Sequence, residues 1–210
     1  TSLDPHQAEL VGISISTKIG KACYIPISHT SGKCIDKKKV INKLRPILED
    51  QSIKKIGQNI KFDYIIFYHN GVNLNSLEDT MLISYVLDAG KNRHNMDTLS
   101  EIHLGHKPIS YKDLVGTGKK QINFKDVDIK KALEYAAEDA DITLRLFEEL
   151  NSKLEQESSL KKLNDEIEIP LIEVLSEMER NGAILNSKIL NSQSKDCLLY
   201  TSDAADEHRR

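Results

Sequence analysis

The segment Gly57–Asp63, with the sequence GQNIKFD, lies between a short apolar run and a helical pattern. The run Ile53–Ile56 is typical of a short strand, and the apolar spacing after it predicts a helix that ends at Asn70-Gly71. A strand-to-helix turn of this kind would place Asn59 and Asp63 one helical turn apart, on one face of the helix. The segment therefore predicts an α/β unit with two polar side chains gathered at a strand end.

Upstream of this turn, the sequence predicts a hairpin over Leu10–Ile27. Apolar residues alternate with small ones over Val11–Ser16, which is typical of a half-buried strand. Lys21–Ile27 is its expected partner, with Gly20 in the connection. Asp36 is expected to cap the helix that follows the hairpin.

Downstream, the pattern is mostly helical. We expect helices over Asp79–Leu87, Leu99–His103, Asp128–Glu155 and Ile167–Arg180, a loop-rich segment over 105–127, and a polar, linker-like segment over 156–166. Strands come early and helices follow in alternation, so the sequence predicts an α/β domain with a mixed sheet over residues 1–155.

The composition excludes several classes of protein. The 210 residues carry 29 Lys and Arg against 32 Asp and Glu, a net charge of −3 that gives no overall attraction to nucleic acid. Apolar stretches are only a few residues long, too short for a membrane helix. The three cysteines have no CxxC spacing and fit a reducing compartment rather than a disulfide framework or a zinc site.

Two further groups of acidic residues are candidates for catalysis or metal binding. In Tyr135–Asp141, YAAEDAD, the side chains of Tyr135 and Asp139 share one helix face. Asp79 and Asp97 each lie near an expected helix start. Carboxylates that converge from separate elements are oxygen ligands for Mg²⁺ or Mn²⁺, and a pair of such ions suits phosphodiester hydrolysis. A tyrosine one turn away could orient the attacking water.

Simpler interpretations remain open for each group. Asp79 and Asp97 are most simply helix N-caps, because aspartate is among the preferred capping residues. Glu138 and Asp141 fit solvated charges on an amphipathic helix. The basic, glycine-rich stretch Gly116–Lys120 lacks the context of a phosphate-binding loop and indicates at most a flexible contact with a phosphate backbone.

Taken together and in this order, the segments resemble the DnaQ-like 3′→5′ exonuclease (proofreading) domain of bacterial DNA polymerase I, a family A DNA polymerase. GQNIKFD resembles the second exonuclease motif of this family, and YAAEDADIT resembles the third. The segments Asp79–Leu87 and Arg93–Leu99 also resemble the family. Glu166–Asn186 resembles the opening of the polymerase region, which favours this family over an RNase D-like exoribonuclease. The resemblance runs from Leu3 to about Leu190 and implies an RNase H-like fold.

The resemblance also implies roles for individual residues. Asp63 and Asp139 would bind two divalent cations, Mg²⁺ or Mn²⁺ with Zn²⁺ as an alternative, and Tyr135 would orient the water. Phe124 would stack on the frayed DNA end, as aromatic rings do on single strands. The substrate-facing residues implied are Leu3 as a wedge, Gln58, Asn59, Phe62, Arg93 as a phosphate contact, and Phe124.

The sequence departs from the family at its first motif, a strand that ends in Asp-x-Glu. No such strand precedes Leu3, so we expect the chain to be truncated before this motif, with a gap in the sheet beside Leu10–Ser16. With only Asp63 and Asp139 left, we expect cations to be poorly retained and the chain to be inactive or nearly so. We further expect residues 156–195 to hold a linker and the start of a polymerase domain. Residues 196–210 resemble a translated adapter sequence and are expected to form a non-native tail without helical pattern.

The expected function is hydrolysis of the 3′-terminal phosphodiester of single-stranded DNA during replication and repair. The expected partners are a single-stranded 3′ end and a polymerase domain of the same polypeptide, with no membrane involved. We expect a monomer in the bacterial cytoplasm, associated with the nucleoid. The alternatives are a non-catalytic, exonuclease-like module that binds DNA or supports a polymerase, and an RNase D-like exoribonuclease.

Overall fold

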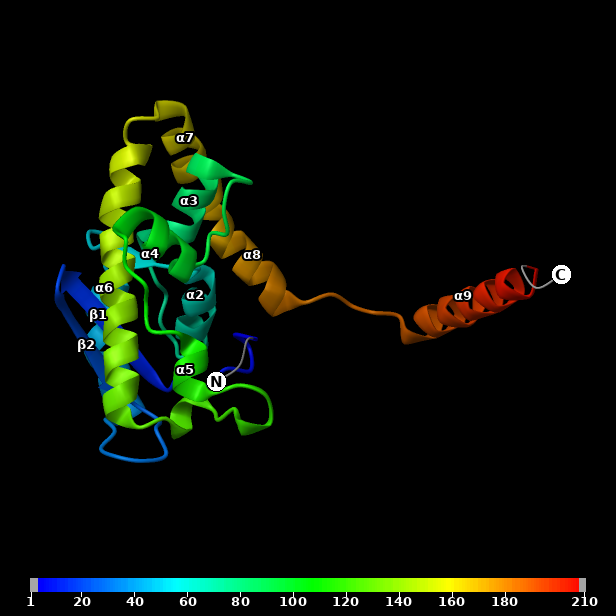
Figure 1. Cartoon of the computed structure of the whole chain (residues 1–210), viewed down its shortest axis with the longest axis horizontal. Coiled ribbons are helices and arrows are strands. Elements are labelled where there is room, and N and C mark those ends of the chain that lie inside the picture. Colours follow the sequence, from blue (N-terminus) through cyan, green and yellow to red (C-terminus); the bar gives the residue numbers. More distant parts are fainter. Residues whose placement is uncertain (1–3, 208–210) are drawn as a thin grey trace. The chain divides into compact units, whose positions relative to one another are not determined.

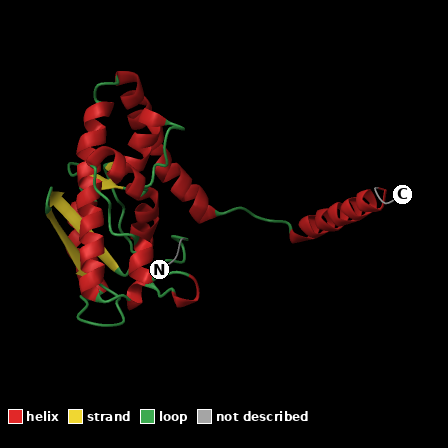
Figure 2. Ribbon diagram, viewed as in Figure 1, coloured by secondary structure: helices red, strands yellow, loops and turns green. Residues whose placement is uncertain are grey.

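The structure, a computed structural model, describes residues 4–207 of the chain and divides it into two compact units. Unit 1 is Thr1–Glu177 and unit 2 is Met178–Arg210. Unit 1 holds all the strands and most of the helices, and unit 2 holds one long helix after the end of α8 (Figure 2).

The strands of unit 1 form two pairs among the described residues. They are β1 (Gly12–Lys18), β2 (Lys21–Pro26), β3 (Lys55–Gly57) and β4 (Leu77–Asp79). The pair β1–β2 is an antiparallel hairpin whose turn uses Gly20 at a positive φ of 76°, which confirms the expected hairpin. The pair β3–β4 is parallel, so both kinds of pairing occur, as the prediction of a mixed sheet requires. The sequence analysis missed β4, because three residues with one apolar side chain give no alternation.

Helices make up the rest of the unit. They are α1 (Lys37–Leu48), α2 (Ile60–His69), α3 (Thr80–Asp88), α4 (Met96–Leu104), α5 (Tyr111–Val115), α6 (Ile129–Leu154), α7 (Ser158–Leu163) and α8 (Ile169–Asn181), with short turns η1 (Gly118–Lys120), η2 (Phe124–Asp126) and η3 (Asn164–Glu168). Asp36 caps α1 by accepting from Lys39 N at 2.9 Å, as predicted. Figure 1 shows α6 extending along unit 1 with the β1–β2 pair beside it.

Two expectations about the later part of the chain are wrong. Residues 156–166 are not a linker, because α7 and the π-helical turn η3 occupy them, Leu160 packs on the core, and Asn164 is fully buried. The residues after Lys195 are helical, since α9 (Ser187–Glu207) continues through them. The physical reason for the helix α9 is local. No glycine or proline occurs after Gly182 to end a helix, and the leucine and alanine residues of this segment favour the helical conformation.

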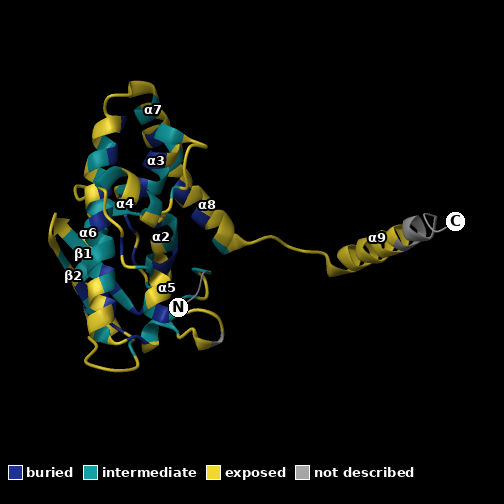
Figure 3. Cartoon of the chain, in the orientation of Figure 1, coloured by how far each residue is buried: buried dark blue, intermediate teal, exposed yellow. Residues whose placement is uncertain are grey.

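The core of unit 1 is built on the buried face of α6 (Figure 3). This helix packs against both strand pairs and against α3, α4, α5 and α7. One buried cluster lies between α6 and the helices α3 and α4, and its members are Ile83, Leu99, Ile142, Leu146, Leu150 and Leu154. A second cluster joins β1 to α1 and α2, and its members are Ile13, Ile27, Val40, Ile41, Tyr64, Val72 and Leu74. None of the helices described in residues 4–207 is long and apolar enough to cross a membrane.

The α6 core makes a prediction about stability. Leu146 is 0% exposed and Leu133, on the same helix, is 42% exposed. Leu146→Ala should lower the free energy of unfolding by about 3 kcal/mol, because it removes buried methyl groups and leaves a cavity. Leu133→Ala should change it by less than about 1 kcal/mol. Urea denaturation followed by circular dichroism measures both, and equal losses in the two variants would contradict this description of the core.

Candidate active site

The outer edge of β1 is open. Ile27 N donates to Val11 O at 2.8 Å, so the carbonyl group of Val11 points toward β2. Because alternate residues of a strand direct their backbone groups to opposite sides, the N–H and C=O groups of Gly12, Ser14 and Ser16 point away from β2. Among the described residues, no strand pairs with this edge.

The outer edge of β3 is open in the same way. Lys55 N donates to Ser76 O at 2.8 Å on the β4 side. The backbone groups of Ile56, one residue further, therefore point to the opposite side, where the described part of the chain again offers no strand. The outer edges of β1 and β3 are thus both unpaired in the described part of unit 1.

A cavity of about 530 Å³ lies between these two edges. Its walls include residues 10 and 12–17 around β1 and residues 53–58 around β3. Helices close its two other sides, with side chains of α1 and α2 on one and of α6 on the other. We call this cavity the strand slot. It confirms the expected gap beside Leu10–Ser16.

Asp63, in the first turn of α2, lines the strand slot. Removal of water by the surrounding protein and the negative charge of Asp79 together raise the pKa of this carboxyl to about 7. The Asp63 residue nevertheless keeps an exposed surface. Asp63 is therefore held in a place where a positive charge would be stabilised.

Asp139, on α6, lines the same slot. Burial raises its pKa to about 7, the hydrogen bond from Tyr135 opposes this, and the charges of Glu138 and Asp97 add to the rise. Its Oδ1 atom is buried without a hydrogen-bond partner. Buried polar oxygens are almost always paired, so this atom marks a position for a ligand that donates a proton or carries positive charge.

Tyr135 lies one turn before Asp139, and its hydroxyl is within hydrogen-bond reach of the carboxylate. Burial and the nearby Asp139 charge both raise the pKa of this hydroxyl far above its ordinary value. Tyr135 therefore stays protonated at neutral pH and serves as a hydrogen-bond donor or a positioning group, never as a base.

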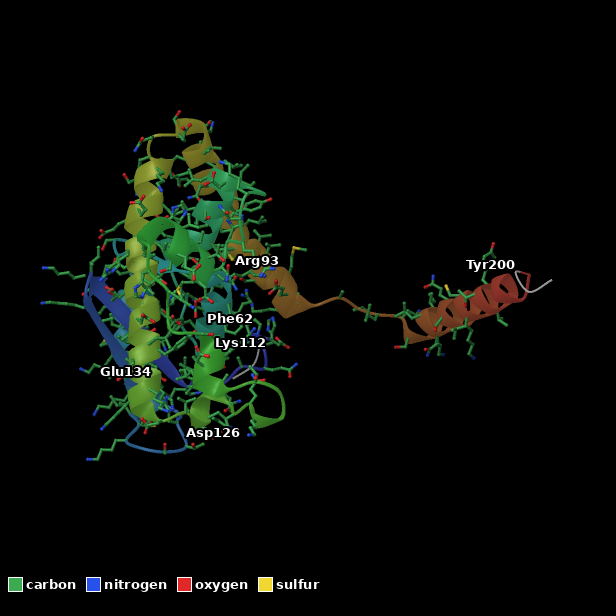
Figure 4. The ribbon with its side chains drawn as sticks, in the orientation of Figure 1. Phe62, Arg93, Lys112, Asp126, Glu134 and Tyr200 are labelled. Atoms are coloured by element: carbon green, nitrogen blue, oxygen red, sulfur yellow. The ribbon has the colours of Figure 1, made fainter. Side chains whose placement is uncertain are left out.

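The residues predicted to contact the substrate differ in where they lie and in how exposed they are. Gln58 lines the slot and donates from Nε2 to His94 O at 2.7 Å. Asn59 is exposed at the start of α2, and Phe62 follows it on the helix (Figure 4). Arg93 is exposed in the segment before α4. Leu3 lies outside the described residues.

Phe124 belongs to an aromatic cluster next to Tyr135. Its ring stacks on Tyr111, with ring centroids 6.2 Å apart and 14° between the planes, and lies 6.2 Å from Tyr135. His29 packs on it as well, at 5.9 Å. Sequence reasoning did not find Tyr111, whose segment had been expected to form a loop.

Several acidic residues differ from their expected roles. Asp97 is not an N-cap, because Asn95 takes that position in α4, and its charge acts on Asp139 instead. Glu138 is not a solvated charge, since it accepts from His106 Nε2 at 2.9 Å and Ile109 N at 2.7 Å. Asp141 likewise accepts from Gly20 N at 2.5 Å, which ties α6 to the hairpin turn.

Comparison with known proteins agrees with this geometry. A profile of the family described as "3'-5' exonuclease" matches residues 1–155. The chain belongs to this exonuclease family. It is 41% identical to DNA polymerase I of Rhizobium leguminosarum over 99% of this chain, and 41% identical to DNA polymerase I of Pseudomonas aeruginosa over 93% of it. The chain spans 22% of the length of each of these relatives.

Solved structures show the same fold. The POL domain of Pol1 from M. smegmatis, in complex with DNA primer-template and dNTP, matches with a TM-score of 0.71 and 20% identity, over 93% of this chain and 30% of that one. Brucella melitensis NrnC with bound Mg²⁺ matches with a TM-score of 0.56 and 24% identity, over 89% of this chain and 86% of that one. These likenesses support the predicted DnaQ-like, RNase H-like fold.

Two carboxylates in the slot have the chemistry of metal ligands. Asp63 and Asp139 offer the carboxylate oxygens that hard divalent cations prefer, and the unpartnered Oδ1 of Asp139 fits such an ion. In the described part of the chain, no three His, Cys, Asp or Glu side chains come together to hold a metal.

The raised pKa of Asp139 makes a prediction about stability and pH. Its pKa rises from 3.8 to about 7 on folding, so between these values the folded chain binds more protons than the unfolded chain. The free energy of unfolding should therefore fall as the pH rises through this window. Asp139→Asn should be more stable than the unchanged chain at pH 8 and equally stable near pH 4, measured by urea denaturation in EDTA.

The control is Asp126→Asn, at an exposed aspartate in η2 (Figure 4). Its effect at pH 8 measures what the same Asp→Asn change does at an exposed position. A stability difference for Asp139→Asn that stays constant between pH 4 and pH 8 would contradict the raised pKa of Asp139.

Proposed function

We propose that the chain acts as the 3′→5′ exonuclease domain of a DNA polymerase I and hydrolyses the 3′-terminal phosphodiester of single-stranded DNA. The observation that carries the proposal is the strand slot, which is lined by Asp63 from α2 and by Asp139 from α6, with Tyr135 beside Asp139. Membership in the exonuclease family supports it. The products are nucleoside monophosphates, released one at a time.

Each of the three residues has a role in this proposal. Asp63 and Asp139 each hold one of two divalent cations, which when bound lower the pKa of water and stabilise the leaving oxygen. Tyr135 donates a hydrogen bond and orients the attacking water, because its hydroxyl keeps its proton. The burial that raises the pKa of Asp139 also strengthens its attraction for a cation, since local dielectric screening is low.

Several described residues are proposed to hold the substrate strand, and one of them, Gln58, lines the slot. Gln58, Asn59 and Phe62 contact the strand from the start of α2, and the exposed Arg93 contacts a phosphate. Phe124 stacks on the frayed end together with Tyr111, whose ring is 44% exposed. Leu3 acts as the wedge against the terminal base.

The slot receives one further β-strand in the active protein. An extended segment would pair with the open backbone groups of Ser14 on one side and Ile56 on the other. An Asp-x-Glu pair at its end would add the missing oxygen ligands beside Asp63 and Asp139, which is the arrangement that the family resemblance implies. Such a pair occurs nowhere in the 210 residues.

The polymerase domain of the same polypeptide is the proposed partner, since the relatives are DNA polymerases. The protein is proposed to act as a monomer. An RNase D-like exoribonuclease and a non-catalytic module are the competing functions, and the experiments below separate them.

The first experiment supplies the missing strand. The 210-residue chain alone should show no Mg²⁺-dependent trimming of a 5′-labelled single-stranded DNA. The same chain preceded by an apolar strand that ends in Asp-x-Glu should trim it from the 3′ end. A matched strand that ends in Asn-x-Gln should stabilise the fold equally but stay inactive. Trimming by the chain alone would contradict the need for the strand.

The second experiment uses the complete polymerase. Asp139→Ala should lower exonuclease turnover by about 100-fold or more, because a cation loses its ligand. Primer extension by the same variant should be unchanged, and so should its melting temperature within a few degrees. Loss of both activities would show that Asp139 is structural, and faster trimming of RNA than of DNA in the unchanged protein would favour the exoribonuclease.

A further inference from the structure

Asp79 is a buried carboxylate that the proposed chemistry does not use. Its side chain is 1% exposed, and it caps α3 by accepting from Met81 N at 2.8 Å. The same carboxylate also reaches across to α2, where it accepts from Asn59 N at 3.1 Å and Ile60 N at 2.8 Å. One side chain therefore satisfies the first N–H groups of two helices.

The start of α2 depends on this contact. Asn59 occupies the N-cap position with φ 62° and ψ 50°, in the left-handed region, and its own side chain makes no capping hydrogen bond. Asparagine is among the preferred N-caps, but it normally caps from an extended conformation. Asp79 thus replaces Asn59 as the cap of α2, and Asn59 stays exposed.

The strand register explains why Asp79 is in reach. In the β3–β4 pair, Asp79 is opposite Gly57, so α2 and α3 begin at the same end of the two strands. Thr80 supports this junction by donating from Oγ1 to Gly57 O at 3.1 Å and to the Gln58 side chain. Gly57 has no room for a side chain, because a Cβ would lie 2.7 Å from Ile60 Cβ.

From these contacts we propose that Asp79 is a positioning residue: by holding Asn59 in the left-handed conformation, it sets the first turn of α2 and places Asp63 in the slot. The inference rests on the proposed function in one respect, that Asp63 holds a cation. Without Asp79, Asn59 relaxes to the ordinary N-cap conformation and caps α2 itself. The first turn of α2 then rotates and moves Asp63.

The test separates the two roles of Asp79, which are capping α3 and capping α2. Asp79→Ser keeps a good N-cap for α3, but one hydroxyl oxygen cannot also serve Asn59 and Ile60. Asp36→Ser is the matched control, because it makes the same change at the N-cap of α1, away from α2. Asp63→Asn marks the loss of the cation ligand itself.

Two quantities are measured by NMR on the 210-residue chain. The first is the backbone conformation of Asn59, from its Cα and Cβ shifts. The second is the affinity for Mn²⁺, from the broadening of amide signals in the first turn of α2. Asp79→Ser should move Asn59 out of the left-handed region and weaken Mn²⁺ binding by about 10-fold or more. Asp36→Ser should change neither quantity.

A rescue variant excludes a merely structural effect. Glycine adopts the left-handed region freely, so adding Asn59→Gly to Asp79→Ser should restore most of the Mn²⁺ affinity. Asp79→Asn, which keeps one acceptor oxygen, should give an intermediate loss and is the variant to use if Asp79→Ser does not fold.

The outcomes distinguish the inference from the proposed function. If Asn59 keeps its left-handed conformation in Asp79→Ser, if affinity falls equally in Asp36→Ser, or if glycine gives no rescue, then Asp79 does not position Asp63. If Asp63→Asn binds Mn²⁺ as tightly as the unchanged chain, the proposed cation role of Asp63 fails. The conformation of Asn59 in Asp79→Ser still decides the positioning role in that case.

Discussion

The packing of α6 against both strand pairs is the constraint on which the site depends. The helix buries one stripe of side chains, from Ala132 to Leu154, against β1, β3, α3 and α4. Because its length spans both pairs, it holds their open edges at the two sides of one cavity. The same helix carries Tyr135 and Asp139 on the turns that border this cavity. The buried stripe therefore fixes the place of two of the three proposed catalytic residues.

The elements with strong local signals could be predicted from the sequence. The alternation of apolar and small residues identified the hairpin, and Gly20 identified its turn. Asp36 identified the start of α1. The three-to-four spacing on α6 gave its extent within one residue at each end, since many turns repeat the same pattern. The two aspartates proposed as ligands also came from sequence motifs, and the structure places both in the strand slot.

The rest depends on contacts that no local pattern records. β4 is three residues long and exists because β3 lies beside it. The position of Asp97 near a helix start predicted a cap, but α4 begins two residues earlier, so Asn95 occupies the N-cap position and Asp97 lies in the first turn. The left-handed Asn59 could not be foreseen either, because its cap comes from Asp79, twenty residues away in the sequence and adjacent only through the strand register.

The open edges of β1 and β3 also bear on how the chain associates with others. An unpaired strand edge is a template for aggregation when another sheet can approach it. Here side chains of α1, α2 and α6 line the slot between the two edges. These helices limit the approach of a preformed sheet to the edges of β1 and β3. They therefore lower the tendency of this part of unit 1 to associate edge to edge with another chain.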